Sequence, residues 1–273
     1  MTDADIPPLG DVIRRHGLDA KKSLGQHFLL DTNLTARIAR AAGDLQAGTT
    51  IEIGPGPGGL TRALLDGGAN VIAVERDQRC IAALGELQAA YPDRLQVIEG
   101  DALETDVTTL GAAPRRIVSN LPYNISAPLL IGWLKEAPAF TSMTLMFQKE
   151  VADRLVAQPG SKSYGRLSVM TQWICNAKPV FNIDRKAFTP PPKVMSTVVH
   201  LMPYPEPLAP AEWTAMETVV QAAFGQRRKM LRQSLKAFGF DFEGLRIDPT
   251  DRAENLDVAA FARLANAIPG KAA

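Results

Sequence analysis

The tetrapeptide Asn-Leu-Pro-Tyr at residues 120–123 carries groups suited to holding a nucleobase amine. The exocyclic amine of adenine is a poor nucleophile because its lone pair is delocalised into the ring. The side-chain oxygen of Asn120 and the backbone carbonyl of Leu121 can each accept one amine hydrogen, which favours a pyramidal nitrogen. Pro122 stiffens the turn, and Tyr123 offers an aromatic face for stacking. The motif predicts group transfer to an amine without a strong general base, although a plain strand-to-helix turn also fits it.

A glycine-rich loop follows the predicted strand at 50–53. It reads Glu52-Ile53-Gly54-Pro55-Gly56-Pro57-Gly58-Gly59. The spacing of Gly54, Gly56 and Gly59 satisfies the dinucleotide fingerprint, and glycine lets the backbone turn sharply or approach a ligand. The two prolines lack N–H donors, so the loop is poorly suited to binding a pyrophosphate. Glu52 would repel a diphosphate and attract the amino and sulfonium groups of S-adenosylmethionine, so a neutral or cationic ligand fits better.

Acidic residues also follow the next two predicted strands, at 71–75 and 95–99. Glu75 ends the first of these strands and can accept hydrogen bonds from both hydroxyls of a ribose. Asp101 follows the second and can accept a hydrogen bond from an adenine amine. Either residue alone is equally well explained as a helix cap or a turn residue. Three acids after three successive strands favour a cofactor site at one edge of a sheet.

A second aromatic residue is a candidate for the other side of the base slot. Phe188 begins the segment Phe-Thr-Pro-Pro-Pro-Lys-Val, whose prolines occupy 190–192. A rigid, extended proline loop can hold Phe188 opposite Tyr123 at little cost in conformational entropy. The alternative is that Phe188 packs in the core, as most phenylalanines do and as we expect for Phe181.

The elements that must position these residues alternate short apolar runs with helical patterns, which is typical of βαβ units and a mostly parallel sheet. The predicted strands are 50–53, 71–75, 95–99, 116–119, 144–148, 179–183 and 197–202, the last two forming an antiparallel end to the sheet. A helix is predicted to begin after Asp31, a suitable N-cap. The sequence therefore predicts an α/β fold with a Rossmann-like sheet of the S-adenosylmethionine-dependent methyltransferase type.

Proline marks the predicted end of this first domain. Four prolines lie between 203 and 210, where neither a central strand nor a helix can continue, so we place a linker there. Residues 211–273 show helical spacing without strands and predict a small α-helical domain, which we expect to bind RNA through its basic residues. The catalytic domain would then span 1–202, with the segment at 1–48 covering the cofactor.

The composition is that of an ordinary globular protein and excludes several classes. The 273 residues are 46% hydrophobic and 22% charged, which excludes a disordered chain, a collagen-like fibre and a disulfide miniprotein. Cys80 and Cys175 stand too far apart for a disulfide framework or a thiolate metal site, so no metal is expected. No apolar run approaches the roughly 20 residues that span a bilayer, and the start of the chain lacks a signal peptide. We therefore expect a cytoplasmic protein without a membrane partner.

The net charge of +1, from 30 basic and 29 acidic residues, hides a strongly basic segment. No acidic residue lies between 218 and 240, where the basic residues are Arg227, Arg228, Lys229, Arg232 and Lys236. The spacing of four between Arg228, Arg232 and Lys236 predicts a basic stripe along one helix face that follows RNA phosphates. The alternative is an ordinary solvated helix face.

Five motifs together resemble those of the ribosomal RNA adenine dimethyltransferases, in order from about residue 20 to 260. They are Lys-Ser-Leu-Gly-Gln-His-Phe-Leu at 22–29, the glycine loop, Asn-Leu-Pro-Tyr, the triple-proline segment, and Phe-Gly-Gln-Arg-Arg-Lys at 224–229. The resemblance implies that the chain uses S-adenosylmethionine to dimethylate two adjacent adenosines in a hairpin loop near the 3′ end of 16S rRNA. The substrate would be a pre-formed small ribosomal subunit.

The resemblance also implies where the cofactor binds. The matching positions are His27, Leu29, Gly54, Glu75, Asp101 and Asn120, to which the loop adds Gly56. His27 is a departure, because the family usually has asparagine there. Histidine can still donate and accept a hydrogen bond, but its contact then depends on tautomer and pH.

The sequence alone is compatible with three other functions. The related erythromycin-resistance branch methylates one adenine of 23S rRNA, although the triple-proline and Gln-Arg-Arg-Lys segments favour the small-subunit branch. The glycine spacing also fits an NAD-dependent oxidoreductase, which would leave the residues at 120–123 unexplained. A non-catalytic RNA-binding factor could keep the fold, but the presence of Glu75, Asp101 and Asn120 favours an enzyme. We expect the chain to act as a monomer.

Overall fold

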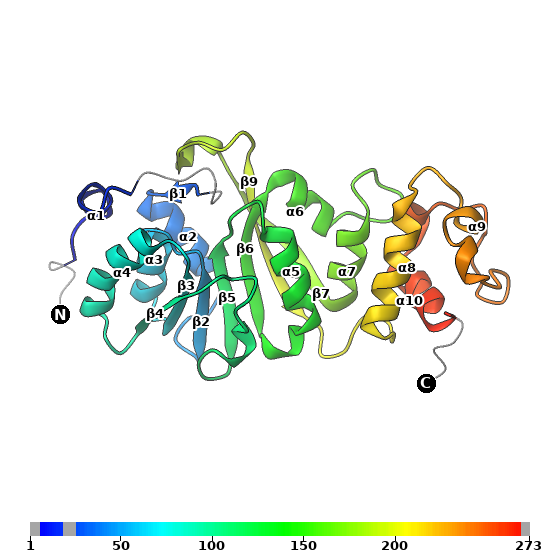
Figure 1. Ribbon diagram of the computed structural model, residues 1–273, viewed down its shortest axis with the longest axis horizontal. Helices are drawn as coiled ribbons and strands as arrows, with labels where there is room; N and C mark the ends of the chain where they lie inside the picture. The colour runs from blue at the N-terminus through cyan, green and yellow to red at the C-terminus, as the bar shows by residue number, and fades with distance from the viewer. Residues whose placement is uncertain (1–5, 19–25, 269–273) are drawn as a thin grey trace. The chain divides into compact units, whose positions relative to one another are not determined.

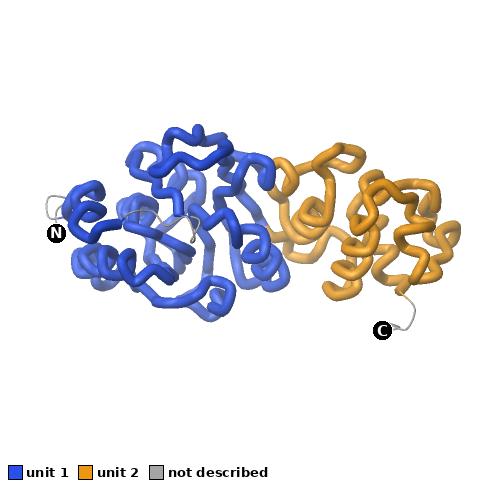
Figure 2. Tube along the Cα trace, turned by 45° about the horizontal axis from the view of Figure 1, so that its top comes forward, with its two compact units in different colours: residues 1–152, 178–202 blue, residues 153–177, 203–273 orange. Residues whose placement is uncertain are grey.

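The computed structural model describes residues 6–18 and 26–268, and the chain forms two compact units. Unit 1 consists of residues 1–152 and 178–202, and unit 2 of residues 153–177 and 203–273 (Figure 2). No helix in the described ranges is both long enough and apolar enough to cross a membrane. Residues 22–25 of the N-terminal motif lie outside the described part of the chain.

A seven-stranded sheet with the order β4-β3-β2-β5-β6-β9-β7 forms the centre of the first unit (Figure 1). The strands are β2 (Thr49–Ile53), β3 (Val71–Glu75), β4 (Leu95–Glu99), β5 (Arg115–Asn120), β6 (Ser142–Gln148), β7 (Cys175–Ile183) and β9 (Ser196–Pro203). Strands β2 to β6 pair in parallel, whereas β9 is antiparallel to β6. The predicted strands and the α/β fold class are therefore confirmed.

The register of the parallel strands explains where a site can form. Every residue of β2 is buried, which is typical of a central strand covered on both faces. Ile53 of β2 pairs with Val74 of β3, and Glu75 pairs with Glu99 of β4. Because parallel strands run in the same direction, the loops after them meet at the same edge of the sheet.

Two helices precede the first strand of this sheet in the chain, and the others connect its strands. They are α1 (Leu9–Arg15), α2 (Thr32–Ala41), α3 (Gly59–Asp66), α4 (Gln78–Ala90), α5 (Ser126–Lys135) and α6 (Lys149–Leu155). Asp31 caps α2 as predicted, because its carboxylate accepts the backbone N–H groups of Asn33 and Leu34. Ile38 of α2 packs in the same core cluster as Leu64 of α3.

Two short strands not predicted from the sequence form a second, two-stranded sheet. Strand β1 (Phe28–Leu29) pairs antiparallel with β8 (Phe188–Thr189). Side chains alternate along a strand, and in β8 the first side chain is buried and the second exposed. This pairing joins the N-terminal motif to the triple-proline segment.

Unit 2 is helical, as predicted, but it begins earlier in the chain. Its helices include α7 (Arg166–Ile174), α8 (Trp213–Gly225), α9 (Leu231–Ser234) and α10 (Val258–Asn266). The predicted boundary places residues 153–177 in the catalytic domain, whereas in the structure they belong to unit 2. The reason is aromatic packing, because Trp173 stacks on Trp213 and Tyr164 contacts Phe224 edge-on.

The segment predicted as a linker is also held by hydrogen bonds within unit 2. The backbone N–H groups of Tyr204 and Leu208 donate to the carbonyls of Ile174 and Trp173, and the Trp173 indole donates to Ala209. Strand β9 ends at Pro203, and residues 204–210 form neither helix nor strand, as expected from their prolines, but they are not a free linker.

Candidate active site

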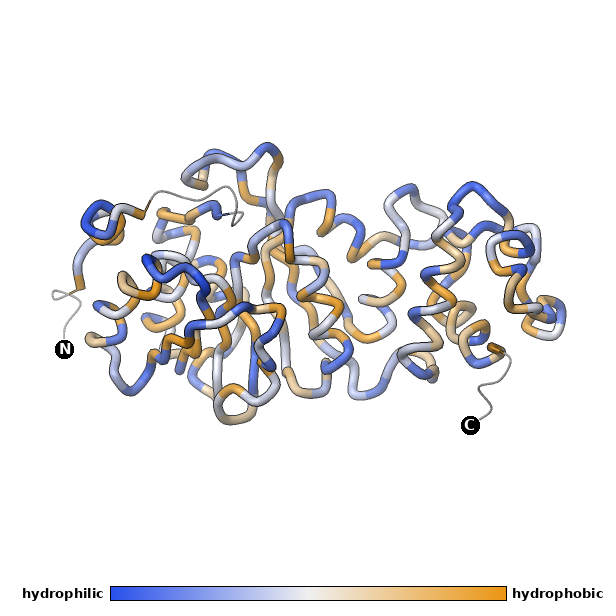
Figure 3. Tube along the Cα trace, viewed as in Figure 1, coloured by the Kyte–Doolittle hydropathy of each residue, from blue (hydrophilic) through white to orange (hydrophobic). Residues whose placement is uncertain are grey.

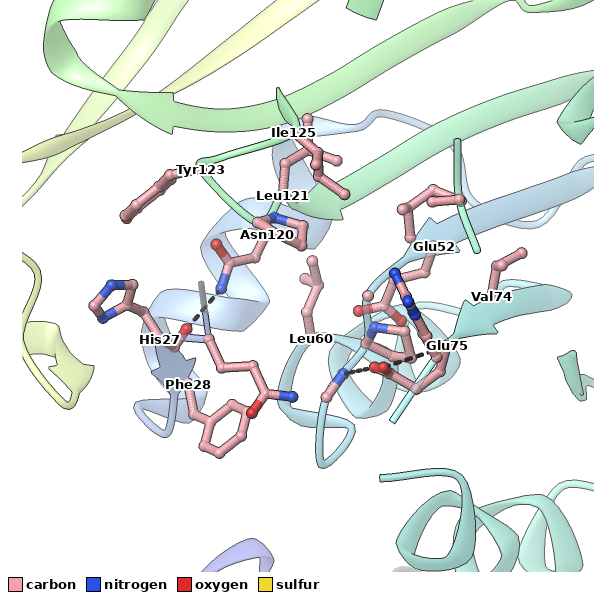
Figure 4. A pocket seen from close by; sticks show the side chains of 18 of the residues that line it. His27, Phe28, Glu52, Leu60, Val74, Glu75, Asn120, Leu121, Tyr123 and Ile125 are labelled. Carbon is pink, nitrogen blue, oxygen red and sulfur yellow. Dashed lines mark hydrogen bonds between the residues drawn. The ribbon is translucent and has the colours of Figure 1, made fainter. Parts of the chain in front are cut away.

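A pocket lies at the edge of the sheet where β2, β3 and β5 end (Figure 4). Its lining contains most of the predicted site residues: His27, Leu29, Glu52, Gly54, Gly56, Glu75, Asp101, Asn120, Leu121, Pro122 and Tyr123. Phe188, also predicted for this site, is not part of the lining. The fold therefore brings together groups that lie up to about a hundred residues apart in the sequence.

The course of the glycine loop depends on glycine at two of the predicted positions. Gly54 and Gly56 have φ angles of 64° and 57°, in the left-handed region that other residues rarely adopt. A Cβ atom on Gly56 would lie 3.1 Å from the ring of Phe28, which also lines the pocket. A side chain at position 56 would thus strain the loop and press on the N-terminal motif.

Glu75 is fixed by three backbone donors. Its Oε1 accepts the N–H groups of Arg76 and Asp77 at 2.8 Å, and its Oε2 accepts the N–H of Gly56 at 3.0 Å. Burial raises the pKa of the Glu75 carboxyl, while these hydrogen bonds oppose the rise. Each carboxylate oxygen has two lone pairs, so Oε2 keeps one acceptor position for a ligand. That position fits one ribose hydroxyl better than the two that we predicted.

Asp101 is partly engaged within the protein. Its Oδ1 accepts the backbone N–H of Leu103 at 3.0 Å, and its Oδ2 pairs with the Arg76 guanidinium at 2.8 Å. The hydrogen bond from Leu103 is typical of a turn residue, which is the alternative that the sequence allowed for Asp101. Because the Arg76 side chain is 70% exposed, the ion pair is weak enough for a ligand to replace it.

Glu52 is a buried acid at the base of the glycine loop. It is 1% exposed, and its Oε2 accepts a hydrogen bond from the Thr61 hydroxyl at 2.6 Å. Burial raises the pKa of Glu52 to about 8, and the nearby Glu75 charge acts in the same direction. The amino and sulfonium groups of a cofactor would favour the charged form, so their positive charge fits this site.

The orientation of Asn120 is set by the backbone of the N-terminal motif. Its Nδ2 donates a hydrogen bond to the carbonyl oxygen of His27 at 3.1 Å. With the amide nitrogen held there, the side-chain oxygen points away from that carbonyl and is available as an acceptor (Figure 4). This is the group expected to accept a hydrogen from the target amine.

The rings of Tyr123 and His27 lie against each other beside Asn120. Their centroids are 5.4 Å apart, with an interplanar angle of 29°. The Tyr123 hydroxyl shares a 2.6 Å hydrogen bond with Ser196, and burial raises the pKa of the phenol. His27 Nδ1 lies 2.7 Å from the carbonyl of Pro190. A carbonyl can only accept, so Nδ1 carries the proton.

The position of Phe188 corrects the prediction that this ring faces Tyr123. Phe188 is 2% exposed, packs in the main core cluster, and meets His27 edge-on at 6.5 Å between centroids. Alternation along β8 decides this orientation, because Phe188 points inward and Thr189 outward. Core packing, the alternative considered for this residue, is what the structure has.

Several contacts of this site were not predicted from the sequence. Gln26 donates to the Asp77 carboxylate at 3.2 Å and lines the pocket with Phe28. Both residues belong to the N-terminal motif, which was the signal that could have identified them. Ser196, which holds Tyr123, carries no comparable signal. Pro190 belongs to the triple-proline motif, but its contact with His27 depends on packing between distant segments.

The five basic residues predicted to bind RNA are all exposed on unit 2. They do not form a stripe on one helix, and that prediction is wrong. Helix α9 contains only four residues, and Lys236 begins a separate 3-10 turn, Lys236–Phe238. The N–H groups of Leu231 and Arg232 donate to the carbonyls of Asp251 and Pro249, so they do not continue a helix from the preceding turn.

Arg227 differs from its basic neighbours because its guanidinium is bound within unit 2. It donates to the backbone carbonyls of Lys162 and Tyr164, both at 2.9 Å, and lies 3.4 Å from the Glu254 carboxylate. This residue therefore connects the segment before α7 to the turn after α8. Its exposed part can still face a polyanion.

The solved structures of two other proteins resemble the chain. A dimethyladenosine transferase from Plasmodium falciparum is 28% identical, with a TM-score of 0.74 and coverage of 87% of this chain and 96% of that one. The 23S rRNA methyltransferase ErmE is 27% identical, with a TM-score of 0.66 and coverage of 88% and 99%.

Other proteins are more similar to the chain in sequence than these two are. The ribosomal RNA small subunit methyltransferase A of Rhodospirillum rubrum is 62% identical over 268 residues, which cover 96% of this chain and 93% of the relative. The protein of that name from Paramagnetospirillum magneticum is also 62% identical, with coverage of 98% and 97%. The family model for ribosomal RNA adenine dimethylases matches residues 17–269, almost the whole chain. The chain therefore belongs to the ribosomal RNA adenine dimethylase family.

Proposed function

We propose that this protein transfers methyl groups from S-adenosylmethionine to the N6 amine of adenosines in small-subunit ribosomal RNA. The observation that carries the proposal is the orientation of Asn120, whose Nδ2 is held by the His27 carbonyl while its oxygen stays available beside Tyr123. Membership of the adenine dimethylase family and a pocket that suits the cofactor support the same reaction.

The pocket fits the cofactor by the chemistry of its donors and acceptors. Glu75 Oε2 would accept a ribose hydroxyl, and Asp101 would accept the adenine amine once Arg76 moves aside. Buried Glu52 would face the positively charged end of the ligand. When bound, S-adenosylmethionine supplies an electrophilic methyl group on a positively charged sulfur.

The residues at 120–123 would prepare the amine for attack. The Asn120 oxygen and the Leu121 carbonyl each accept one amine hydrogen, which directs the nitrogen lone pair out of the plane of the base. Tyr123 stacks on the base, and its bond to Ser196 holds the ring in place. An amine buried in a duplex cannot reach this pocket, so the adenosine must be unstacked.

The small ribosomal subunit is the proposed substrate because the relatives at 62% identity are named for it, whereas ErmE shares 27% identity. By the family resemblance, the two targets are adjacent adenosines in a hairpin loop near the 3′ end of 16S rRNA. The protein would act as a monomer on pre-formed small subunits in the cytoplasm. Exposed Arg228, Lys229, Arg232 and Lys236, with part of Arg227, would contact phosphates.

A transfer assay tests this proposal. The protein is incubated with methyl-labelled S-adenosylmethionine and small subunits from a strain that lacks the modification, with large subunits as the matched control. We expect label in dimethyladenosine of 16S rRNA and none in the large subunit. Label in 23S rRNA alone would favour the resistance branch, and no label in either RNA would contradict the proposal.

A further inference from the structure

Helix α1 lies outside the pocket, yet its contacts lead to the pocket wall. None of its residues, 9–15, lines the pocket. It lies against α4 (Figure 1), where the two oxygens of the Glu86 carboxylate each bind a different residue at the end of α1. We propose that Glu86 is a positioning residue for the cofactor site: it holds α1 on α4, and α1 holds Phe28 against the glycine loop. The inference rests on the proposed function, because it requires that S-adenosylmethionine binds in this pocket.

The contact of Glu86 with α1 consists of two hydrogen bonds. Arg15 donates to Oε2 at 2.8 Å, and His16 Nε2 lies 2.8 Å from Oε1. An ionised carboxylate only accepts hydrogen bonds, so Nε2 carries a proton. The hydrogen bond with His16 and the charge of Arg15 lower the pKa of Glu86, which favours the ionised form. The Glu86 side chain is 30% exposed and that of His16 is 23% exposed, so solvent screens this contact only in part.

Apolar packing connects α1 to Phe28. Val12 of α1 is 1% exposed and belongs to one buried cluster with Cys80 and Ala83 of α4 and with Phe28 of β1. Leu18, which follows α1, is also a member of this cluster. Burial of apolar surface stabilises such a cluster, so displacement of α1 would expose the Phe28 ring to water and remove the contacts that fix it.

Phe28 passes this restraint to the pocket. Its ring lines the pocket (Figure 4) and lies so close to Gly56 that a Cβ atom there would be 3.1 Å from it. The backbone N–H of Gly56 donates to Oε2 of Glu75, the oxygen proposed to accept a ribose hydroxyl. A displaced Phe28 would therefore leave both the loop and this acceptor less well ordered. A site that is ordered in advance binds more tightly, because binding then costs less conformational entropy.

Helix α1 has other attachments, which set the size of the expected effect. Arg62 of α3 donates to the carbonyl of Pro7 at 2.7 Å, and Arg79 of α4 donates to the carbonyl of Gly17 at 3.4 Å. Removal of Glu86 should therefore lower the fraction of molecules in which α1 is docked without abolishing docking. The apparent Kd of a ligand rises in proportion as the fraction of binding-competent protein falls.

Calorimetry with S-adenosylmethionine tests the role of Glu86. For Glu86→Ala we expect the cofactor Kd to rise about 5-fold, the order for losing a partly exposed ion pair, and KM for the cofactor to change rather than kcat. Arg15→Ala should also raise the Kd, but it should have no further effect in the Glu86→Ala background, because both residues act through one contact. The matched control is Asp11→Ala, which removes an ion pair with Arg14 within α1 and should leave the Kd near wild type.

Hydrogen exchange on the wild-type protein gives a second test that needs no variant. Coupling between two events is reciprocal, so if docked α1 favours the cofactor, the cofactor favours docked α1. Saturating S-adenosylmethionine should therefore slow amide exchange in α1 several-fold, although α1 does not line the pocket. Helix α10 of unit 2 is the internal control and should exchange at the same rate in both conditions. A helix that only stabilises the fold would not respond to the cofactor more than α10 does.

Three results would each overturn the inference. One is that Glu86→Ala binds the cofactor as tightly as the wild type, and another is that exchange in α1 is the same with and without the cofactor. The third is that Asp11→Ala raises the Kd as much as Glu86→Ala, which would make the effect a general one of α1 stability. A wild-type protein that binds no S-adenosylmethionine would overturn the proposed function and this inference together. One that binds it without labelling 16S rRNA would overturn the proposed function alone.

Discussion

The backbone N–H of Gly56 donates a hydrogen bond to Oε2 of Glu75, with a nitrogen-to-oxygen distance of 3.0 Å. The bond joins the glycine loop after β2 to the carboxylate at the end of β3. Two features that the sequence presents separately, a turn and an acid, therefore act as one part of the pocket.

Replacing Glu75 by glutamine should weaken both the cofactor site and the fold. The amide nitrogen cannot accept a hydrogen bond, so at least one backbone N–H at Gly56, Arg76 or Asp77 loses its acceptor. We expect the free energy of unfolding to fall by about 1–3 kcal/mol, and the S-adenosylmethionine Kd to rise about 10-fold. Urea denaturation and calorimetry measure these changes.

The matched control is Glu99→Gln, at the register partner of Glu75 in β4. Glu99 is exposed and outside the pocket lining, so both quantities should stay near wild type. Equal effects of the two substitutions would contradict a specific role for Glu75.

Removing the Asn120 side chain should slow the chemical step. The Asn120→Ala variant loses the acceptor that the His27 carbonyl orients, so the amine is no longer held in the reactive geometry. We expect kcat at saturating cofactor and RNA to fall about 100-fold, as for a misplaced reacting group. Single-turnover transfer of labelled methyl groups measures it, with Asn176→Ala, at an exposed position of β7 outside the pocket lining, as the control. A kcat near wild type would exclude this role.

Cofactor affinity should depend on pH through Glu52. Burial raises the pKa of Glu52 to about 8, so near neutral pH much of this carboxyl group is protonated in the free protein. The cationic cofactor favours the charged form, so affinity should increase as the pH rises toward 8 and level off above it. Calorimetry from pH 6 to pH 9, at constant ionic strength, measures the trend, which the Glu52→Gln variant should lose.

The raised pKa of Glu52 also determines how the free energy of unfolding changes with pH. Glu52 has an ordinary pKa in the unfolded chain and a raised pKa in the folded protein. Between these two pKa values the folded protein holds a proton that the unfolded chain has lost, so the free energy of unfolding decreases as the pH rises. The free energy of unfolding should therefore fall between about pH 5 and pH 8 more steeply for the wild type than for Glu52→Gln. Parallel curves would show that Glu52 titrates normally.

Arg227 and Arg228 are neighbours with different expected effects. Arg227→Ala removes hydrogen bonds to the carbonyls of Lys162 and Tyr164, so the melting temperature should fall. Arg228→Ala should leave the melting temperature unchanged and raise the KM for small subunits several-fold, less so at high salt. Thermal unfolding and transfer rates at two salt concentrations distinguish them. An unchanged KM for Arg228→Ala would remove this residue from the RNA surface.

Local sequence patterns were sufficient to predict the strands and the principal pocket. Continuous apolar runs identified the parallel strands, and the parallel register then placed Glu52, Glu75, Asp101 and Asn120 at one edge. The glycines at 54 and 56 were predictable for the same reason, because their backbone conformations are local requirements of the turn.

The fold boundary and the basic segment show where local patterns were insufficient. Residues 153–177 carry no sequence signal for unit 2. They join it because Tyr164 and Trp173 pack on Phe224 and Trp213 of α8. The spacing at 228, 232 and 236 suits a helix, but hydrogen bonds from Leu231 and Arg232 to the chain at 249–251 end that pattern.

The sequence by itself determined the α/β class and the pocket residues at the ends of the strands, which are the glycine loop, its acids and the Asn-Leu-Pro-Tyr tetrapeptide, because each depends on residue types at short spacing. Only the tertiary structure decided which ring faces Tyr123. Pairing of β1 with β8 turns Phe188 into the core and brings His27 against Tyr123. That choice depends on strand alternation and on contacts between segments about 160 residues apart, which no local pattern encodes.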